Sequence, residues 1–276
     1  MAAMAPRHAR YRLLAVTVAL VALVPLPLAW AIRDPAQLAG AYFGWGLALW
    51  VAAAGGAVIA ATTFREGEPQ RPGWLLLGGA YLAFAAIVLF VGPRTAHLLP
   101  PDPAGSPWAI FVSNVLWSAL SVAGYLVLSG AWRGSGLDPT SPTAHVVSRV
   151  IAFGIAAVLA GPDLVERFPV ALQGDPVAIA DCLTDVLDGA LFFVAVPVLH
   201  AARALGGGIV AWPWLFLTAS VAGWLGYDAI AVYGEAIGLD PRGIRVGEEV
   251  MRTLGGVCTL TAGMAQRWVM LDTLDR

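Results

Sequence analysis

Lysine is absent from this sequence, because all 16 basic residues are arginines. A retinal photoreceptor, like any enzyme that forms a Schiff base, needs a lysine amine, so both classes are excluded. Cysteine occurs only twice, which excludes a small secreted domain held together by disulfides. Charged residues amount to 12%, against about 25% in a soluble domain. The net charge of −2 lacks the basic excess of a nucleic-acid binder, so no nucleic-acid partner is expected.

Apolar residues, in contrast, make up 59% of the 276 positions. Eight membrane spans of about 20 residues would need about 160 apolar side chains, close to the number present. Apolar runs bounded by charge, proline or glycine predict an all-α, polytopic integral membrane helical bundle with about eight transmembrane helices. We expect a single membrane-embedded domain over residues 1–276. The expected spans are residues 13–32, 40–63, 73–93, 107–132, 146–163, 178–202, 209–233 and 246–270.

The distribution of arginine predicts the orientation of these spans. With the N-terminus inside, ten arginines fall in inner segments and five in outer ones, as the positive-inside rule requires. Both termini are therefore expected in the cytoplasm, and the chain in the inner (plasma) membrane of a bacterial cell. The first span is ambiguous, since its apolar run breaks at Pro25 and Pro27 and follows several arginines, like a cleaved secretory signal. An uncleaved helix is preferred because seven more spans follow, whereas cleavage would leave seven helices.

Carboxylates inside the sixth expected span are the most unusual feature of the sequence. Asp181, Asp185 and Asp188 recur at i, i+4 and i+7, so they share one helix face. Ionisable groups within a span cost several kcal/mol unless they are paired or hydrated, and they mark functional candidates. At 1.5 Å per residue, Asp188 is expected about 15 Å deep, near the middle of the membrane. The alternative is that Asp181, and less readily Asp185, merely reaches outer water.

The seventh and eighth expected spans add further charges. Asp228 lies near the outer end of one, and Glu248, Glu249 and Arg252 open the other. Arg252 follows the two glutamates at i+4 and i+3, a spacing that permits a local ion pair. The alternative is a bridge from Arg252 to Asp185, which is expected at a similar depth. That bridge would join the sixth and eighth spans.

A neutral polar stripe runs along the fourth expected span. Asn114, Ser118 and Ser121 occur at i, i+4 and i+7, and Tyr125 extends the same face. Small polar residues in membrane helices commonly make interhelical hydrogen bonds. The alternative is that the stripe lines the same cavity as the aspartates.

The four histidines and two cysteines predict no metal or cofactor site. No histidine has another histidine, a cysteine or a carboxylate at i+3 or i+4 within a span, and a zinc or haem site needs several converging ligands. His200, near the inner end of the sixth span, is expected at the membrane interface. Cys182 and Cys258 fall in different spans and are expected to be free, buried thiols.

Three functions remain open. The preferred one is an acidic cavity, open to the outside between the fourth, sixth, seventh and eighth spans, that binds or conducts a cation, a proton or a small polar ligand in a transporter or membrane sensor. The second is an intramembrane enzyme for a lipid-like substrate, for which no catalytic residue is assigned. The third is a structural subunit that forms a homo-oligomer or joins a membrane complex. The candidate cavity residues are Asp181, Asp185, Asp188, Asp228, Glu248, Glu249, Arg252, Asn114, Ser118 and Ser121.

Overall fold

The computed structural model describes residues 5–90, 106–136, 138–206 and 208–274, and these residues form helices without any strand. Six helical segments, with α1 and α2 counted as one, are long and apolar enough to cross a membrane. This confirms the all-α prediction and fits a membrane protein. The helices are α1 (Ala5–Ala22), α2 (Pro25–Ala31), α3 (Pro35–Ala61), α4 (Gln70–Phe90), α6 (Ser106–Gly134), α7 (Pro142–Ala171), α8 (Pro176–Ala204), α9 (Ala211–Tyr233) and α10 (Pro241–Leu274).

Each of the eight expected spans corresponds to helix in the structure. The first expected span forms two helices, because α1 ends at Ala22 and α2 begins at Pro25. The largest differences are at α1, which begins at Ala5 where residue 13 was expected, and at α7, which was expected to end at residue 163 but continues through Pro162 and Pro169 to Ala171. The helix α10 is not among the six apolar segments found in the described residues. For α10 the reason is its charged residues, which lower the mean hydropathy.

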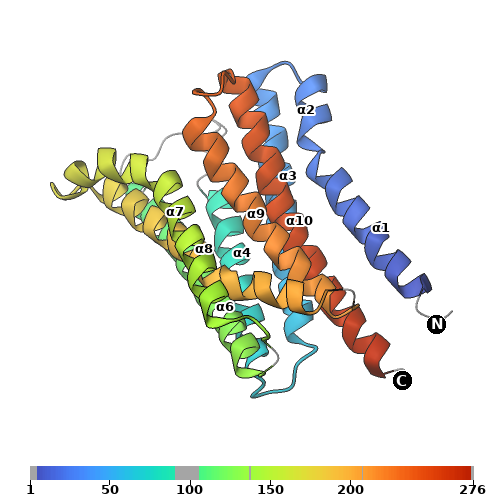
Figure 1. The fold of residues 1–276 in the computed structure, drawn as a ribbon. Helices are drawn as coiled ribbons and strands as arrows, with labels where there is room; N and C mark the ends of the chain where they lie inside the picture. The colour runs from blue at the N-terminus through green and yellow to red at the C-terminus, as the bar shows by residue number, and fades with distance from the viewer. Residues whose placement is uncertain (1–4, 91–105, 137, 207, 275–276) are drawn as a thin grey trace.

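Six of the helices form a closed ring. In order around it, α3 packs against α4, α4 against α6, α6 against α8, α8 against α9, α9 against α10, and α10 against α3. Outside the ring, α1 packs against α10 and α7 against α8 (Figure 1). The outer helix α7 carries apolar side chains that are more than half exposed, among them Val146, Phe153 and Val158. Such an apolar surface is expected of a helix that faces lipid.

Small residues allow neighbouring helices of the ring to approach closely. A Cβ atom on Gly56 of α3 would lie 2.7 Å from the backbone of Leu260 in α10. A Cβ atom on Gly263 of α10 would lie only 1.9 Å from the Gly56 carbonyl oxygen. The backbones of α3 and α10 therefore touch where no side chain fits, as small residues permit in membrane helix pairs.

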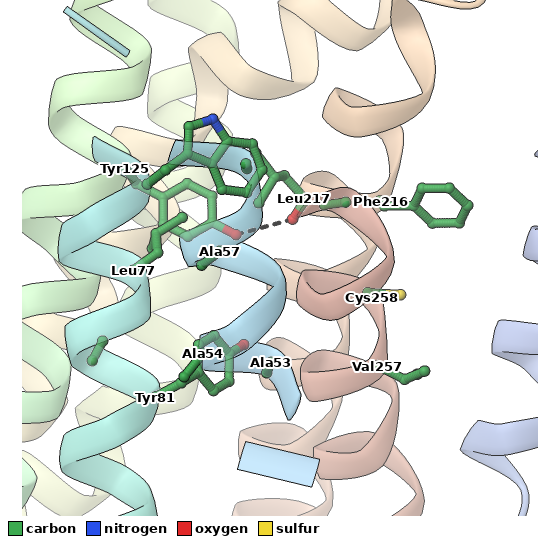
Figure 2. Packing of buried hydrophobic residues seen from close by; sticks show 14 of the residues in the cluster. Ala53, Ala54, Ala57, Leu77, Tyr81, Tyr125, Phe216, Leu217, Val257 and Cys258 are labelled. Carbon is green, nitrogen blue, oxygen red and sulfur yellow. Dashed lines mark hydrogen bonds between the residues drawn. The ribbon is translucent and has the colours of Figure 1, made fainter. Parts of the chain in front are cut away.

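Alanines and buried hydroxyls complete the core of the ring. Figure 2 shows Ala53, Ala54 and Ala57 of α3 among the side chains of the neighbouring helices, and all three are buried. The Tyr125 hydroxyl of α6 donates a hydrogen bond to the carbonyl of Leu217 in α9 at 3.1 Å, drawn as the dashed line in Figure 2. Tyr125, which extends the stripe of the fourth expected span, thus joins α6 to α9.

Two polar contacts attach α1 and α2 to α10. Arg10 of α1 forms a 2.7 Å ion pair with Asp272 of α10. Arg242 of α10 donates to the carbonyls of Ala29 and Ile32 at 2.6 and 2.9 Å, which satisfies free carbonyls at the C-terminal end of α2. The two ends of the chain consequently lie at the same end of the bundle (Figure 1).

Candidate functional site

The first aspartate of the α8 stripe belongs to a salt-bridge cluster. Arg167 of α7 donates a hydrogen bond to Asp181 and also pairs with Asp163 at 3.4 Å. Asp163 and Arg167 are four residues apart in the sequence. Both lie on α7 because this helix continues beyond the end expected from the sequence. The expectation that Asp181 merely reaches outer water is therefore replaced by an ion pair that joins α7 to α8.

The other two aspartates of the stripe line a cavity of about 210 Å³ between α7, α8 and α9. The eighth expected span, α10, was predicted to form part of the wall, but α7 takes this place because it packs across α8 and α9. Apolar residues of α7 close one side. The polar residues of the wall are Asp163, Thr184, Asp185, Asp188, Tyr227 and Asp228.

A second cavity of about 140 Å³ adjoins the first and reaches into the ring. Asp188 and Asp228 line both cavities. The second one adds aromatic walls from Phe84 of α4, Trp117 of α6 and Trp224 of α9. The rings of Trp117 and Trp224 lie 5.1 Å apart between centroids, and those of Phe84 and Trp117 lie 4.8 Å apart. Asp188 and Asp228 thus share this second cavity with aromatic faces.

Three of the four carboxylates that line the first cavity form no ion pair with the described residues. Ser118 of α6 donates a hydrogen bond to Asp188 at 3.0 Å, so this member of the fourth-span stripe does reach the aspartates. Within the described residues, no arginine or histidine forms an ion pair with Asp185, Asp188 or Asp228. Asp185 Oδ2 and the hydroxyl of Thr184 are buried without any hydrogen-bond partner.

The remaining members of the fourth-span stripe do not extend the site. Ser121 is buried but lines neither cavity. Asn114 lies on α6, and its side chain falls outside the described part of the structure. Only Ser118 therefore connects α6 to the aspartates by a hydrogen bond among the side chains described.

The candidate cavity residues of α10 form ion pairs within this helix. Arg252 lies 2.8 Å from Glu249, the local ion pair that the sequence spacing permits, and Arg245 lies 2.9 Å from the same glutamate. Arg245 also approaches Glu248 at 3.6 Å. No ion pair joins α10 to α8 in the described ranges, so the alternative bridge between them is not formed. Arg252 instead donates to the hydroxyl of Tyr227 at 3.0 Å, which orients a residue of the cavity wall.

One histidine is more deeply buried than expected. His200 does not extend to the protein surface, since only 5% of it is exposed. It lies beside His145 of α7 and Asp138, residues that come from other elements and share no local spacing with it. Both cysteines are free and buried, as expected.

The cavity offers a ligand three carboxylates that form no ion pair with the described residues, together with hydroxyl groups, and the adjoining cavity adds aromatic faces. Among the described residues, these carboxylates form no group of three ligand atoms within 4.8 Å of one another, so they do not converge on a point as ligands of a small metal ion would. No protein-family model, curated protein or solved structure matches this chain. Its function is therefore inferred from the geometry of the cavity.

Proposed function

We propose that this chain is a multi-pass membrane protein whose acidic cavity binds a small organic cation, such as a quaternary ammonium ion, from the outer side of the cell membrane. One observation carries the proposal. Asp188 and Asp228, which form no ion pair with the described residues, line one cavity with the aromatic faces of Trp117 and Trp224, and Asp185 lines the adjoining cavity. Carboxylates attract an ammonium group by charge, and aromatic faces attract it through their quadrupole.

The position of these carboxylates within expected membrane spans explains why binding of a cation would be favourable. Unpaired ionisable groups within a span are costly and are retained at ion or ligand pathways. The buried, unpartnered oxygens of Asp185 and Thr184 lie at the same wall and lack hydrogen-bond donors. A bound cation would compensate the charge, and its hydration water would supply donors.

The size of the cavity agrees with an organic ligand. The two adjoining spaces measure about 210 and 140 Å³. Since one water occupies about 30 Å³ of liquid, together they hold on the order of ten waters. This exceeds the space that a bare metal ion needs and suits an alkylated or hydrated ammonium ion.

For the membrane topology we infer eight spans, made of the six apolar segments together with α4 and α10, and cytoplasmic termini. The polar helix α10 can lie in the membrane because its glutamates and Arg245 and Arg252 neutralise one another. Retention of the first helix is supported by Tyr11, which is fully buried and stacks on Trp212 at 5.7 Å. The excess of arginine in the expected inner segments supports the orientation.

Thermal unfolding of the purified protein in detergent tests the cavity. We expect tetramethylammonium chloride to raise the Tm more than sodium chloride at equal ionic strength, because a ligand that binds only the folded state stabilises it. The double variant Asp188→Asn/Asp228→Asn should lose this shift. Glu235→Gln is the control, since it removes a carboxylate charge from an exposed turn after α9 and should keep the shift.

A second variant separates loss of binding from loss of fold. Trp224→Leu removes an aromatic wall while leaving the carboxylates in place, and it should reduce the shift produced by tetramethylammonium. Size-exclusion chromatography establishes that each variant remains folded. Equal shifts in the wild type and the folded double variant, or equal shifts with the two salts, would contradict the proposal. Uptake into liposomes then distinguishes a transporter from a sensor.

A further inference from the structure

Three side chains with metal-binding groups meet far from the acidic cavity. Asp138 lies between α6 and α7, His145 in the first turns of α7, and His200 in the last turns of α8. Along α7, His145 is 18 residues before Asp163 of the cavity wall, which is about 27 Å of helix at 1.5 Å per residue. The cluster is therefore separate from the proposed cation site.

The ligand atoms of this cluster are close together. One atom from each residue lies within 4.8 Å of the others. Asp138 Oδ2 is 3.2 Å from His145 Nε2, and the rings of His145 and His200 meet edge to face with centroids 4.8 Å apart. Tetrahedral zinc with bonds of about 2.0–2.1 Å separates its ligand atoms by roughly 3.4 Å. The side chains would need to close by only about 1–2 Å around the ion.

Hydrogen bonds around Ser148 determine which nitrogen of His200 carries a proton. The Ser148 hydroxyl donates to the carbonyl of Ala144 at 2.8 Å and lies 3.1 Å from His200 Nε2. A hydroxyl has one hydrogen, so Ser148 accepts from Nε2–H of His200. In the neutral ring, Nδ1 then carries the lone pair. Zinc-binding histidines are oriented in this way by a polar group on their second nitrogen.

Three ligand-type atoms of the cluster lack a hydrogen bond. His200 Nδ1, His145 Nδ1 and Asp138 Oδ2 are buried without one, although Asp138 Oδ2 lies 3.2 Å from Nε2 of His145. The second carboxylate oxygen of Asp138 accepts from the amide of Thr140 at 3.0 Å, which fixes the orientation of this side chain. A simple His–Asp ion pair accounts for only one of the two histidines, and it leaves the lone pair of His200 without a function.

We propose that Asp138, His145 and His200 form a binding site for a divalent transition-metal ion, with zinc favoured by the two imidazoles and one carboxylate. Three protein ligands leave a fourth position for water, as in zinc sites that keep an open coordination position. Bound metal would join the segment before α7 and the start of α7 to the end of α8. The site does not depend on the proposed cavity function.

Metal binding by the purified full chain tests this site. We expect one zinc ion per chain in the wild type after removal of excess metal, and visible absorption bands of tetrahedral cobalt after substitution with Co²⁺. His200→Gln and His145→Gln should abolish both signals. Ser148→Ala should weaken binding by about 10–100-fold, because it removes the group that orients His200.

The matched control is His8→Gln, which removes a histidine from α1, the helix that packs against α10. It should bind zinc and cobalt as the wild type does. His145 provides a test that spares the fold, since its side chain is 21% exposed, and size-exclusion chromatography reports on folding. Failure of the wild type to bind either metal overturns the proposal. Equal binding by the wild type and folded His145→Gln protein overturns it as well.

Discussion

Asp188 and Asp181 lie seven residues apart on one face of α8, but their surroundings differ. Asp181 pairs with Arg167 of α7. Asp188 receives a hydrogen bond from Ser118 and has no cation beside it among the described side chains. A charge that is retained without a counter-ion inside a membrane helix indicates function, because such a group reduces stability. The same residue type therefore has a structural role at one position and a binding role in our proposal at the other.

This difference predicts opposite outcomes for two identical substitutions. Without added cation, Asp188→Asn should leave the Tm unchanged or raise it, because the amide keeps the size of the side chain and removes an uncompensated charge. Asp181→Asn should lower the Tm by about 2–4 °C, the equivalent of a partly exposed ion pair of at most about 1 kcal/mol. Thermal unfolding of both variants in the same detergent compares them directly. A loss of stability in Asp188→Asn greater than in Asp181→Asn would show that Asp188 is a structural residue.

At the scale of helices, the packing of α3 against α10 depends on the absence of side chains. Gly55 and Gly56 are neighbours on α3, but their surroundings differ. Gly55 is exposed, and a Cβ atom added to it would have no neighbouring atom within 4 Å, whereas one added to Gly56 would collide with the backbone of Leu260. The two glycines provide a matched pair for measuring how tightly these helices are packed.

We predict that Gly56→Ala destabilises the protein by about 1–3 kcal/mol, because overpacking displaces a backbone that cannot yield. Gly55→Ala should change the stability by less than about 0.5 kcal/mol, as expected for a surface substitution. Chemical unfolding followed by circular dichroism measures both variants. Equal stability of the two variants would mean that α3 and α10 do not touch at Gly56.

At the scale of the whole molecule, the two ends of the chain are joined by the ion pair between Arg10 and Asp272. An even number of spans brings both termini to one side of a membrane, and eight spans satisfy this condition. In our proposal that side is the cytoplasm, because the expected inner segments carry the excess of arginine.

Reporter fusions test this topology in cells. A green fluorescent protein, which does not become fluorescent when exported in unfolded form, should be fluorescent at either terminus. Alkaline phosphatase, which is active only outside the cytoplasm, should be active when inserted at Gln173, between α7 and α8. Phosphatase activity at the C-terminus would reverse the predicted orientation. Fluorescence at only one terminus would contradict eight spans.

The sequence by itself determined the helical architecture and the approximate positions of the helices. Apolar runs, and the charged residues, prolines and glycines that bound them, depend only on local composition. They predicted helices close to the observed ones, apart from the earlier start of α1 and the extension of α7. Periodicity also placed Asp181, Asp185 and Asp188 on one face, because the face of a helix depends on residue spacing alone. The pairing of Arg252 with Glu249 was predictable for the same reason.

Only the tertiary structure decided which residues meet across helices. Arg167 pairs with Asp181 because α7 packs against α8, and Trp117 and Trp224 enclose the cavity because α6 and α9 belong to the same ring. His200 meets the residues before and at the start of α7 only through this packing. The order of the helices around the ring results from contacts between residues far apart in the sequence. The spacing of residues within one helix does not predict these contacts.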